Sequence, residues 1–546
     1  MKKLLTKTVF LLLLSAFTVE AFCYDLTTHP ASVLNERLFD KNNFVSPHKF
    51  MKMFMQYTDV TGNEKITVHF PAEMREDGTN DFTVNLPDGI SWTYKEILTE
   101  YIAARILNTM LNNGGTRCFV VCPEKWIDTI ERSLTRYKLY GRIKDRLETY
   151  YGVSSFKIQY NPAEVLTDKR PQFIQKQKNP SISYHDSDGV YIGIDIGGSS
   201  IKLAAIVRGK EHILGKINEK FYAGKSAQEY IGLVKKSIMT AHKQLCKTVN
   251  DIKIDGIGIS WNAAIKDNII IYEESEKKRL GATEIEKILH LPDDIRNWVN
   301  KTYGPEVGTV VRNDGHMGAF QAAYSERRSK TAYLGVGTSI AFGCINREGR
   351  NAPGLCELHF SRIDLNSTGN GSEYDIPGSL GYYLTIWGII KEGKKLGVVK
   401  DDIPAISFEE AARIVSQANA GDKIKLSIAK TMGRYLAEVA LNICDNWSVD
   451  HVIVGGGLLT GKFGNTMIEE AKHILKKNFP EVKISLSQYN GNVTYVSAIG
   501  AARYVSSMKS EREANANKSL KDIVHQTVLN QQSKVLDHEC LICLHR

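Results

Sequence analysis

Asp195 stands at the end of an apolar stretch and is followed by glycines and serines. The groups in this segment that could hold phosphate or metal are Asp195, Gly197, Gly198, Ser199, Ser200 and Lys202. Glycines permit a tight hairpin and bring backbone N–H groups close to an anion, and the serine hydroxyls add further donors. A lone carboxylate such as Asp195 suits Mg²⁺ held through water, because Mg²⁺ keeps most of its water ligands. The pattern predicts a phosphate-binding hairpin, with an ordinary hairpin over a buried aspartate as the alternative.

A second carboxylate, Asp314, follows Asn313 at the junction between an apolar stretch and a segment rich in small residues. A carboxylate here could take a proton from an attacking hydroxyl, and phosphoryl transfer asks little else of a protein beyond positioning and charge stabilisation. The alternative is that Asn313 and Asp314 only cap the helix that follows. His316, close behind them, is more typical of a core or surface histidine than of a catalytic one.

Two further glycine-containing turns follow apolar stretches. Gly337 and Thr338 offer backbone N–H groups and a hydroxyl to phosphate oxygens. The triple glycine Gly455, Gly456 and Gly457 would let the backbone approach an adenine or ribose face closely. Each turn taken alone could equally be an unremarkable loop.

Two glutamates in the later part of the chain, Glu357 and Glu373, are candidates for binding neutral hydroxyl groups. A carboxylate accepts two or more hydrogen bonds, and directional polar contacts of this kind discriminate well between sugars.

The order and spacing of these motifs resemble the ROK family of sugar kinases and regulators, a branch of the sugar kinase, actin and chaperone ATPase group. That family opens with Asp-x-Gly-Gly-Thr and a following lysine, and here Ser199 stands in for the threonine while Lys202 is in place. The resemblance implies that Asp314 is the catalytic base. It implies ATP and Mg²⁺ as cofactors, with the two hairpin turns on the phosphates and the triple glycine on adenosine. Sugar binding would fall to Asn313, Asp314, Glu357 and Glu373.

The sugar-facing motifs depart from the family pattern in two places. The family's Pro-Gly after the second strand is replaced by residues 260–263, and Asn262 there is a weak candidate for a hydroxyl contact. Phe360 occupies the position of a family histidine, with His359 one residue before it. The cysteine-rich zinc loop that often follows is replaced by residues 367–372, so no structural zinc is expected there.

The resemblance implies a two-lobed actin/hexokinase-like fold, of ribonuclease H-like α/β type, over residues 189–504, with the ligands in the cleft between the lobes. Before a polar linker near residue 185 lies an α/β module of unknown role, residues 24–185, with helical periodicity at 94–111 and 126–150 around a short apolar strand at 118–122. Residues 505–546 read as a polar tail.

Composition sets further limits. The chain has 546 residues and a formal net charge of +9, with no lysine/arginine run that would indicate a nucleic-acid site. A basic start and an apolar run in residues 1–23 indicate a secretory signal peptide, too short for a stable membrane span. An exported or periplasmic location is therefore expected, or a cytoplasmic one where the leader is not used. Cys540 and Cys543 could ligate a metal, but they lack a second cysteine pair.

Three hypotheses for function remain open at this point. The first is ATP-dependent phosphorylation of a hexose or amino sugar. The second is a sugar-responsive regulator or a sugar-binding protein without catalysis, although the winged helix that such regulators carry is not found. The third is an exported ATP-binding effector with a non-sugar acceptor. A homodimer is also left open.

Overall fold

A computed structural model describes part of the chain, and all structural statements below concern that part. The described residues are 44–57, 64–70, 81–86, 90, 92–113, 117–135, 144, 148, 157–162, 180–183, 188–197, 200–219, 226–250, 252–266, 268–272, 280, 282–352, 354–366, 377–447, 449–487 and 494–516.

The first lobe is built on a five-stranded sheet with the order β11-β8-β5-β6-β7. Its strands are β5 (Val190–Ile196), β6 (Ile201–Val207), β7 (Lys210–Ile217), β8 (Gly256–Trp261) and β11 (Gly308–Asn313). The first three form an antiparallel meander, whereas β8 and β11 run parallel to β5. Numbered within the lobe, the strand order is 3-2-1-4-5, which is the ribonuclease H-like arrangement.

Both faces of this sheet are covered, as the alternation of side chains along β5 requires. Ile192 and Ile194 pack with α7 (Ala227–Leu245) and α10 (Leu291–Tyr303), whereas Tyr191 packs with α17 (Val496–Ala516) on the other face. The lobe is completed by β9 (Ala264–Lys266), β10 (Ile269–Tyr272) and α9 (Ala282–Leu289).

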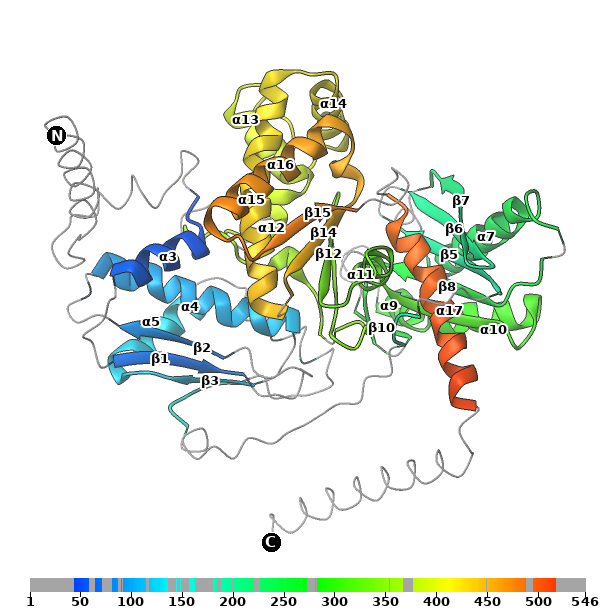
Figure 1. Ribbon diagram of the computed structural model, residues 1–546, viewed down its shortest axis with the longest axis horizontal. Helices are drawn as coiled ribbons and strands as arrows, with labels where there is room; N and C mark the ends of the chain where they lie inside the picture. Colours follow the sequence, from blue (N-terminus) through cyan, green and yellow to red (C-terminus); the bar gives the residue numbers. More distant parts are fainter. Residues whose placement is uncertain are drawn as a thin grey trace, which may run out of the picture.

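The second lobe repeats the same plan with fewer strands. Its sheet has the order β13-β12-β14-β15, made of β12 (Thr331–Val336), β13 (Ile340–Ile345), β14 (His451–Gly455) and β15 (Lys483–Leu486). Again the first hairpin is antiparallel and the later strands run parallel to its first strand. The helices of this lobe are α12 (Leu380–Leu384), α13 (Ile386–Lys395), α14 (Phe408–Asn419), α15 (Lys423–Trp447) and α16 (Gly461–Asn478), several of them at the top of Figure 1.

Two helices, α11 (Asp314–Ser325) and α17, lie between the two sheets (Figure 1). They pack so closely that a Cβ added at Gly500 would lie 1.9 Å from the carbonyl oxygen of Met317. A Cβ added at Gly315 would lie 2.0 Å from the carbonyl oxygen of Phe342, in the second lobe. Glycine at these positions is therefore needed for packing. The predicted two-lobed α/β fold is confirmed.

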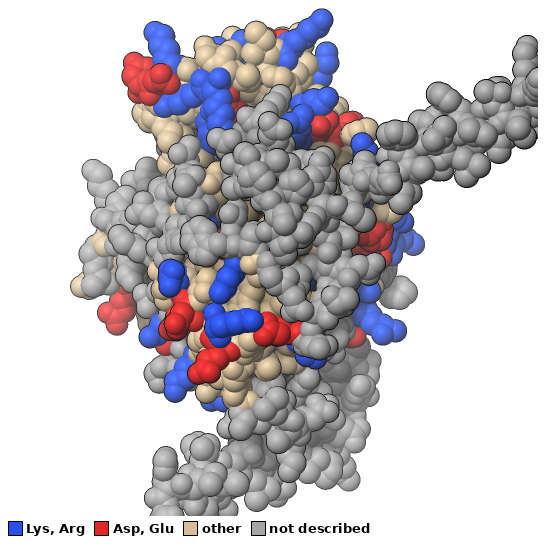
Figure 2. All heavy atoms as spheres, turned by 90° about the vertical axis from the view of Figure 1, so that its left-hand side faces the viewer, with Lys and Arg blue, Asp and Glu red and all other residues tan. Residues whose placement is uncertain are grey.

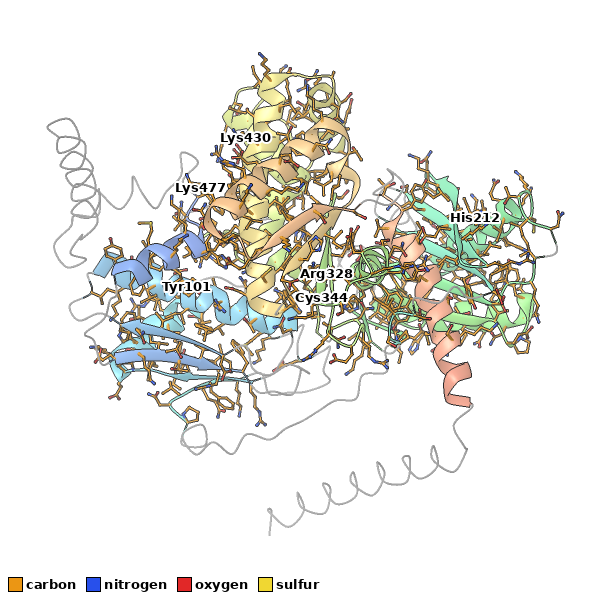
Figure 3. The ribbon with its side chains drawn as sticks, viewed as in Figure 1. Tyr101, His212, Arg328, Cys344, Lys430 and Lys477 are labelled. Atoms are coloured by element: carbon orange, nitrogen blue, oxygen red, sulfur yellow. The ribbon has the colours of Figure 1, made fainter. Side chains whose placement is uncertain are left out.

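The N-terminal module is a separate α/β layer beside the second lobe (Figure 1). It contains α3 (Pro47–Tyr57), β1 (Glu64–His69), β2 (Phe82–Leu86), α4 (Trp92–Asn113), β3 (Arg117–Val121), α5 (Glu124–Thr135) and β4 (Lys157–Tyr160), with the sheet order β2-β1-β3-β4. The helix–strand–helix order expected from the sequence is present as α4, β3 and α5. The strands β1 and β2 were not anticipated. Figure 3 shows Tyr101 on α4, which, like α3, packs against α15 of the second lobe.

The surface charge and the length of the helices give little further indication of function. Figure 2 shows basic and acidic side chains intermixed on the described part of one face. Among the helices of the described residues, none is long and apolar enough to cross a membrane. The predicted signal peptide and the Cys540–Cys543 pair lie outside the described residues.

Candidate functional site

The β5–β6 hairpin carries a charged pair directly beside its turn. Asp195 and Lys202 are partners in the strand register, and the Lys202 ammonium donates to Asp195 Oδ2 at 2.8 Å. Ser260, the register partner of Asp195 on the neighbouring strand β8, donates its hydroxyl to Asp195 Oδ1 at 2.8 Å. The turn itself is closed by a bond from the Gly197 N–H to the Ser200 carbonyl at 3.2 Å. The buried Asp195 carboxylate is thus fixed from two sides.

The ammonium of Lys202 stays charged in this setting. Burial alone would lower the pKa of Lys202, but the carboxylates of Asp195 and Asp314 raise it above its ordinary value. A fixed positive charge at this hairpin is available to phosphate oxygens.

Asp314 lies at the first turn of α11, where β11 ends. Asn313 is the N-cap, and the Gly315 N–H donates to the Oδ1 atoms of both Asn313 and Asp314 at 2.9 Å. Both the capping and the catalytic interpretations of the sequence are therefore compatible with the structure. Asp314 is half-buried. The side chain of Asn313 also donates to the Ala263 carbonyl at 3.1 Å.

The environment of Asp314 raises its pKa to about 7. Burial is the main cause, and repulsion from Asp195 and Glu357 adds to it, whereas the Gly315 N–H and Lys202 act in the opposite direction. A carboxylate with a pKa near neutrality is suited to general-base work, because it is both available and basic at the working pH.

The turn of the β12–β13 hairpin is also closed by a glycine N–H, but no charged pair stands beside it. The Gly337 N–H bonds to the Ser339 carbonyl at 3.1 Å, and Thr338 at the tip is exposed. The hydroxyl of Ser339 lies 3.3 Å from His359 Nδ1. This turn can therefore offer hydroxyl and backbone groups to a ligand.

The triple glycine begins at the last residue of β14, beside the same hairpin. Gly456 has a φ of 101°, and an added Cβ would lie 2.4 Å from the Val336 carbonyl oxygen. Gly455 is similarly confined, with Tyr333 Oη 2.8 Å from an added Cβ. An added Cβ at Gly457 would meet nothing within 4 Å. Two of the three glycines are thus needed for backbone packing, and Gly457 borders open space.

Glu357 stands immediately before a short 3-10 helix, η4 (Leu358–Phe360). Its carboxylate lies within electrostatic range of Asp314 and makes the smallest contribution to the raised pKa of that group. Phe360 is buried in the core of the N-terminal module, while His359 reaches Ser339. The side chain at the position of the family histidine therefore serves packing.

Other predicted residues lie outside the described residues. These are Gly198, Ser199 and Glu373.

His316 belongs to the core, as one of the sequence interpretations held. Its Nε2 lies 3.3 Å from the Cys356 Sγ, and burial together with repulsion from Arg312 lowers its pKa to about 4. It is neutral at physiological pH.

Ser260 is a site residue that sequence reasoning missed. The available signal was its position at the end of the strand after the first hairpin, since parallel neighbours end at the same sheet edge.

The carboxylate of Asp195 fits a Mg²⁺ ion held through water. Each of its oxygens accepts one bond, from Ser260 or Lys202, and a carboxylate oxygen has capacity for a further one. Within the described residues, no cluster of three or more His, Cys, Asp or Glu side chains could hold a metal directly.

Comparisons with known proteins give structural likenesses only. No family model and no curated protein matches the chain. The chain is similar to a ROK family glucokinase from Streptomyces griseus, solved with glucose and AMPPNP, at 17% identity and a TM-score of 0.44, covering 57% of this chain and 98% of that one. It is also similar to a ROK hexokinase from Thermus thermophilus at 16% identity and a TM-score of 0.41, covering 59% and 99%.

A third similar structure is a ROK family transcriptional regulator, a homologue of the E. coli MLC protein. The identity is 13% and the TM-score 0.43, with 75% of this chain and 96% of that chain covered. Because these identities and TM-scores are low, the fold assignment rests on strand order and direction.

Proposed function

We propose that this chain is a ROK-type kinase that transfers the γ-phosphoryl group of Mg-ATP to a hydroxyl of a hexose or amino sugar. The observation that carries the proposal is the grouping of Asp314, whose pKa is about 7, with the Asp195–Lys202 ion pair and Glu357. A base, a fixed cation and a second carboxylate near the base are the groups that such a transfer needs.

Each residue has a distinct task in this proposal. Asp314 accepts the proton of the attacking hydroxyl, and Asn313 and Glu357 orient the sugar. Lys202 stabilises negative charge on the transferring group, since its ammonium is held in place by Asp195. Asp195 would hold Mg²⁺ through water, and the ion would neutralise the phosphates when bound.

The nucleotide would lie across the two hairpin turns, with its phosphates at Gly197, Ser200, Gly337 and Thr338. The support for this is that both turns are tight and lie at the ends of equivalent strands. Gly457, whose α-carbon borders open space, is suited to the adenosine end.

A coupled assay with a panel of hexoses and amino sugars, glucose first, tests the proposal. Wild type should turn over at least one sugar, and Asp314→Asn should lose that turnover. Asp255→Asn is a matched control, because Asp255 is also paired with a lysine in the first lobe, Lys509 at 2.6 Å, but lies outside the site. The proposal fails if no sugar is phosphorylated and the ATPase rate of Asp314→Asn equals that of wild type. Sugar binding without turnover would instead favour the regulator hypothesis.

Export remains a separate proposal, based on the basic and apolar residues 1–23. Fractionation with N-terminal sequencing of the mature chain tests it. A mature chain starting near residue 24 outside the cytoplasm supports export, and an intact Met1 in the cytoplasm contradicts it.

A further inference from the structure

The segment 354–366, which carries Glu357, has little regular structure of its own. Within it the only element is η4, a single turn of 3-10 helix. An irregular backbone must find hydrogen-bond partners elsewhere, and a side chain that orients a ligand needs a rigid support. Some partners of this segment lie in the second lobe, where the Ile363 N–H donates to the Gly378 carbonyl at 2.8 Å, and many others lie on the N-terminal module.

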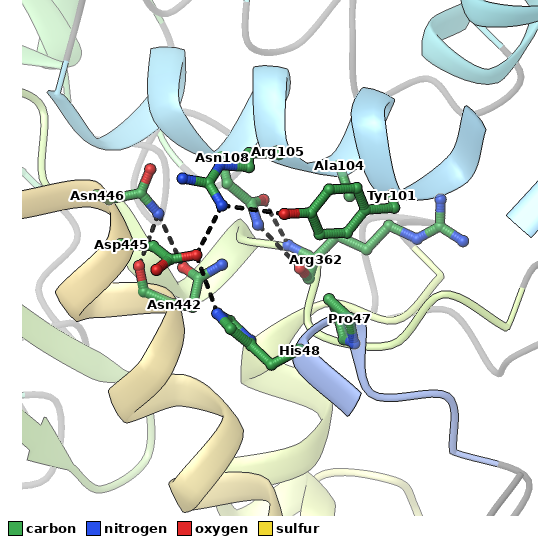
Figure 4. Close-up of a pocket in the computed structure, with 10 residues that line it drawn as sticks. All are labelled: Pro47, His48, Tyr101, Ala104, Arg105, Asn108, Arg362, Asn442, Asp445 and Asn446. Carbon is green, nitrogen blue, oxygen red and sulfur yellow. Dashed lines mark hydrogen bonds and ion pairs between the residues drawn. The ribbon is translucent and has the colours of Figure 1, made fainter. Parts of the chain in front are cut away.

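Helix α4 of the module holds the segment through two buried asparagines one turn apart. The Asn108 amide makes a double contact with the backbone of Arg362, donating to its carbonyl at 2.9 Å and accepting from its N–H at 2.8 Å. The Asn112 side chain donates to Ser361 Oγ at 2.6 Å, and the backbone carbonyl of Asn112 accepts from the Cys356 N–H at 3.1 Å. The donor Cys356 is adjacent to Glu357. Figure 4 shows Asn108 and Arg362 side by side at the edge of a small polar pocket.

The approach between α4 and the segment leaves no room for an extra atom. Gly354 has a φ of 122°, and an added Cβ would lie 2.3 Å from the Asn112 carbonyl oxygen. The close backbone approach at Gly354 therefore adds to the side-chain contacts of Asn108 and Asn112.

The far end of the segment is held as well. Arg362 is fully buried and ion-paired with Glu100 of α4. The Val45 N–H donates to Asp364 Oδ1 at 2.8 Å, and the Val45 carbonyl accepts from the Leu365 N–H at 2.9 Å. The side chains of Leu355, Phe360 and Leu365 are part of the module's own hydrophobic core. Because Cys356, Leu358 and Ile363 belong to the core of the second lobe, the segment packs between that lobe and the N-terminal module.

We propose that the N-terminal module positions the acceptor-binding segment, with Asn108 as the central positioning residue. This inference rests on the proposed function in assigning Glu357 to the acceptor. Glu357 lies within this segment, whereas the described link from the segment to the turns assigned to ATP is the contact between His359 and Ser339 at 3.3 Å. Loosening the module should therefore weaken acceptor binding much more than nucleotide binding.

Asn108→Ala and Asn113→Ala in the full-length chain form a matched pair of variants. Asn113 lies on the same helix and is also buried, but it donates to the Asn446 carbonyl of α15 at 2.7 Å and not to the segment. With Asn108→Ala, the KM for the acceptor sugar should rise about tenfold, while the KM for ATP stays within about twofold. Asn113→Ala should leave both KM values within about twofold. If Asn108→Ala folds poorly, Ser361→Ala is the second variant to test. It removes the Asn112 contact from the segment side, and it should raise the KM for the acceptor sugar by less than Asn108→Ala.

Hydrogen exchange provides a readout that needs no turnover. In Asn108→Ala, amides in residues 354–366 should exchange faster than in wild type, including the Arg362 N–H that loses its acceptor. In Asn113→Ala they should exchange as in wild type. Unchanged exchange in Asn108→Ala overturns the inference, and so does faster exchange with an unchanged acceptor KM. A chain inactive on every sugar would sink the proposed function, and the exchange pattern would still decide whether the module holds the segment.

Discussion

The two lobes contain equivalent hairpins that differ in charge. In β5–β6 the residue pair second from the turn is Asp195 and Lys202, and in β12–β13 the pair in the same register is Gly335 and Ala341. Both turns are closed by a glycine N–H bond, at 3.2 and 3.1 Å. A Cβ added at Gly335 would lie 3.1 Å from the Ala341 Cβ, so a larger side chain would need its neighbour to shift.

The difference shows that equivalent hairpins in a repeated fold can take different roles. The first hairpin supplies fixed charge, and the second supplies backbone groups and a hydroxyl. Asp314 lies on the charged side, since it follows β11 of the first sheet. Electrostatic stabilisation is most effective where charge develops during the reaction, and in our account that is the side of the acceptor hydroxyl and the transferring phosphoryl group.

The largest expected effect comes from removing the base on the charged side. Asp314→Asn should lower kcat by about 10³-fold, because a positioned general base contributes on this scale. The substitution keeps an oxygen that can accept from the Gly315 N–H, so the helix cap should persist. Steady-state kinetics with the best sugar measure this, beside Asp255→Asn at near wild-type rate. A decrease of less than tenfold would contradict the role of Asp314.

Neutralising the charged hairpin should have the next largest effect. Asp195→Asn should lower kcat by about 10²-fold, because it removes the anchor of Lys202 and the carboxylate proposed for Mg²⁺. The Mg²⁺ concentration for half-maximal rate should also rise, which a magnesium titration measures. An unchanged magnesium dependence would argue against Asp195 as the metal-holding group.

The ionised carboxylate of Asp314 should destabilise the folded protein, and a stability measurement can show this. The folded-state pKa of Asp314 lies above its ordinary value of 3.8, so the folded state is favoured when this group is protonated, and that contribution is lost as pH rises from about 4 to about 7. At pH 8, Asp314→Asn should therefore raise the free energy of unfolding by on the order of 2 kcal/mol. Urea unfolding at pH 8 and pH 5 measures this, with a smaller gain expected at pH 5. Equal stability of the variant and wild type at pH 8 would show that Asp314 is not strained.

The smallest effect should come from the neutral hairpin. Thr338→Ala should raise the KM for ATP about fivefold and leave kcat within about threefold, because only one exposed hydroxyl contact is lost. Initial rates at varied ATP measure both constants. A decrease in kcat as large as that of Asp195→Asn would remove the proposed division between the hairpins.

The sequence predicted those parts of the site that depend on adjacent residues. The Asp195 to Lys202 hairpin and the Asn313–Asp314 cap are local, and glycine turns between apolar strands carry a strong signal of their own. The two-lobed fold was expected from the family resemblance that the order of these motifs carries.

Contacts between distant residues could not be predicted in the same way. The bond from Ser260 to Asp195 depends on strand register, and the burial of Phe360 depends on the core of a module far away in the chain. Asn108 and Asn112 look like polar residues of an ordinary helix, and only the tertiary structure shows that they hold the backbone around Glu357. The strands β1 and β2 are short and partly exposed, so their hydrophobic pattern is weak.

The most direct test of the central claim is the pH dependence of sugar phosphorylation by the wild-type chain, measured with both substrates well below saturation so that the rate reports the free enzyme. If Asp314 is the base, the rate should rise with pH through an inflection near 7 and then level off, because only the deprotonated carboxylate accepts the proton. A rate that is flat between about pH 5.5 and 8.5, or an inflection near the ordinary aspartate pKa of about 4, would contradict the account.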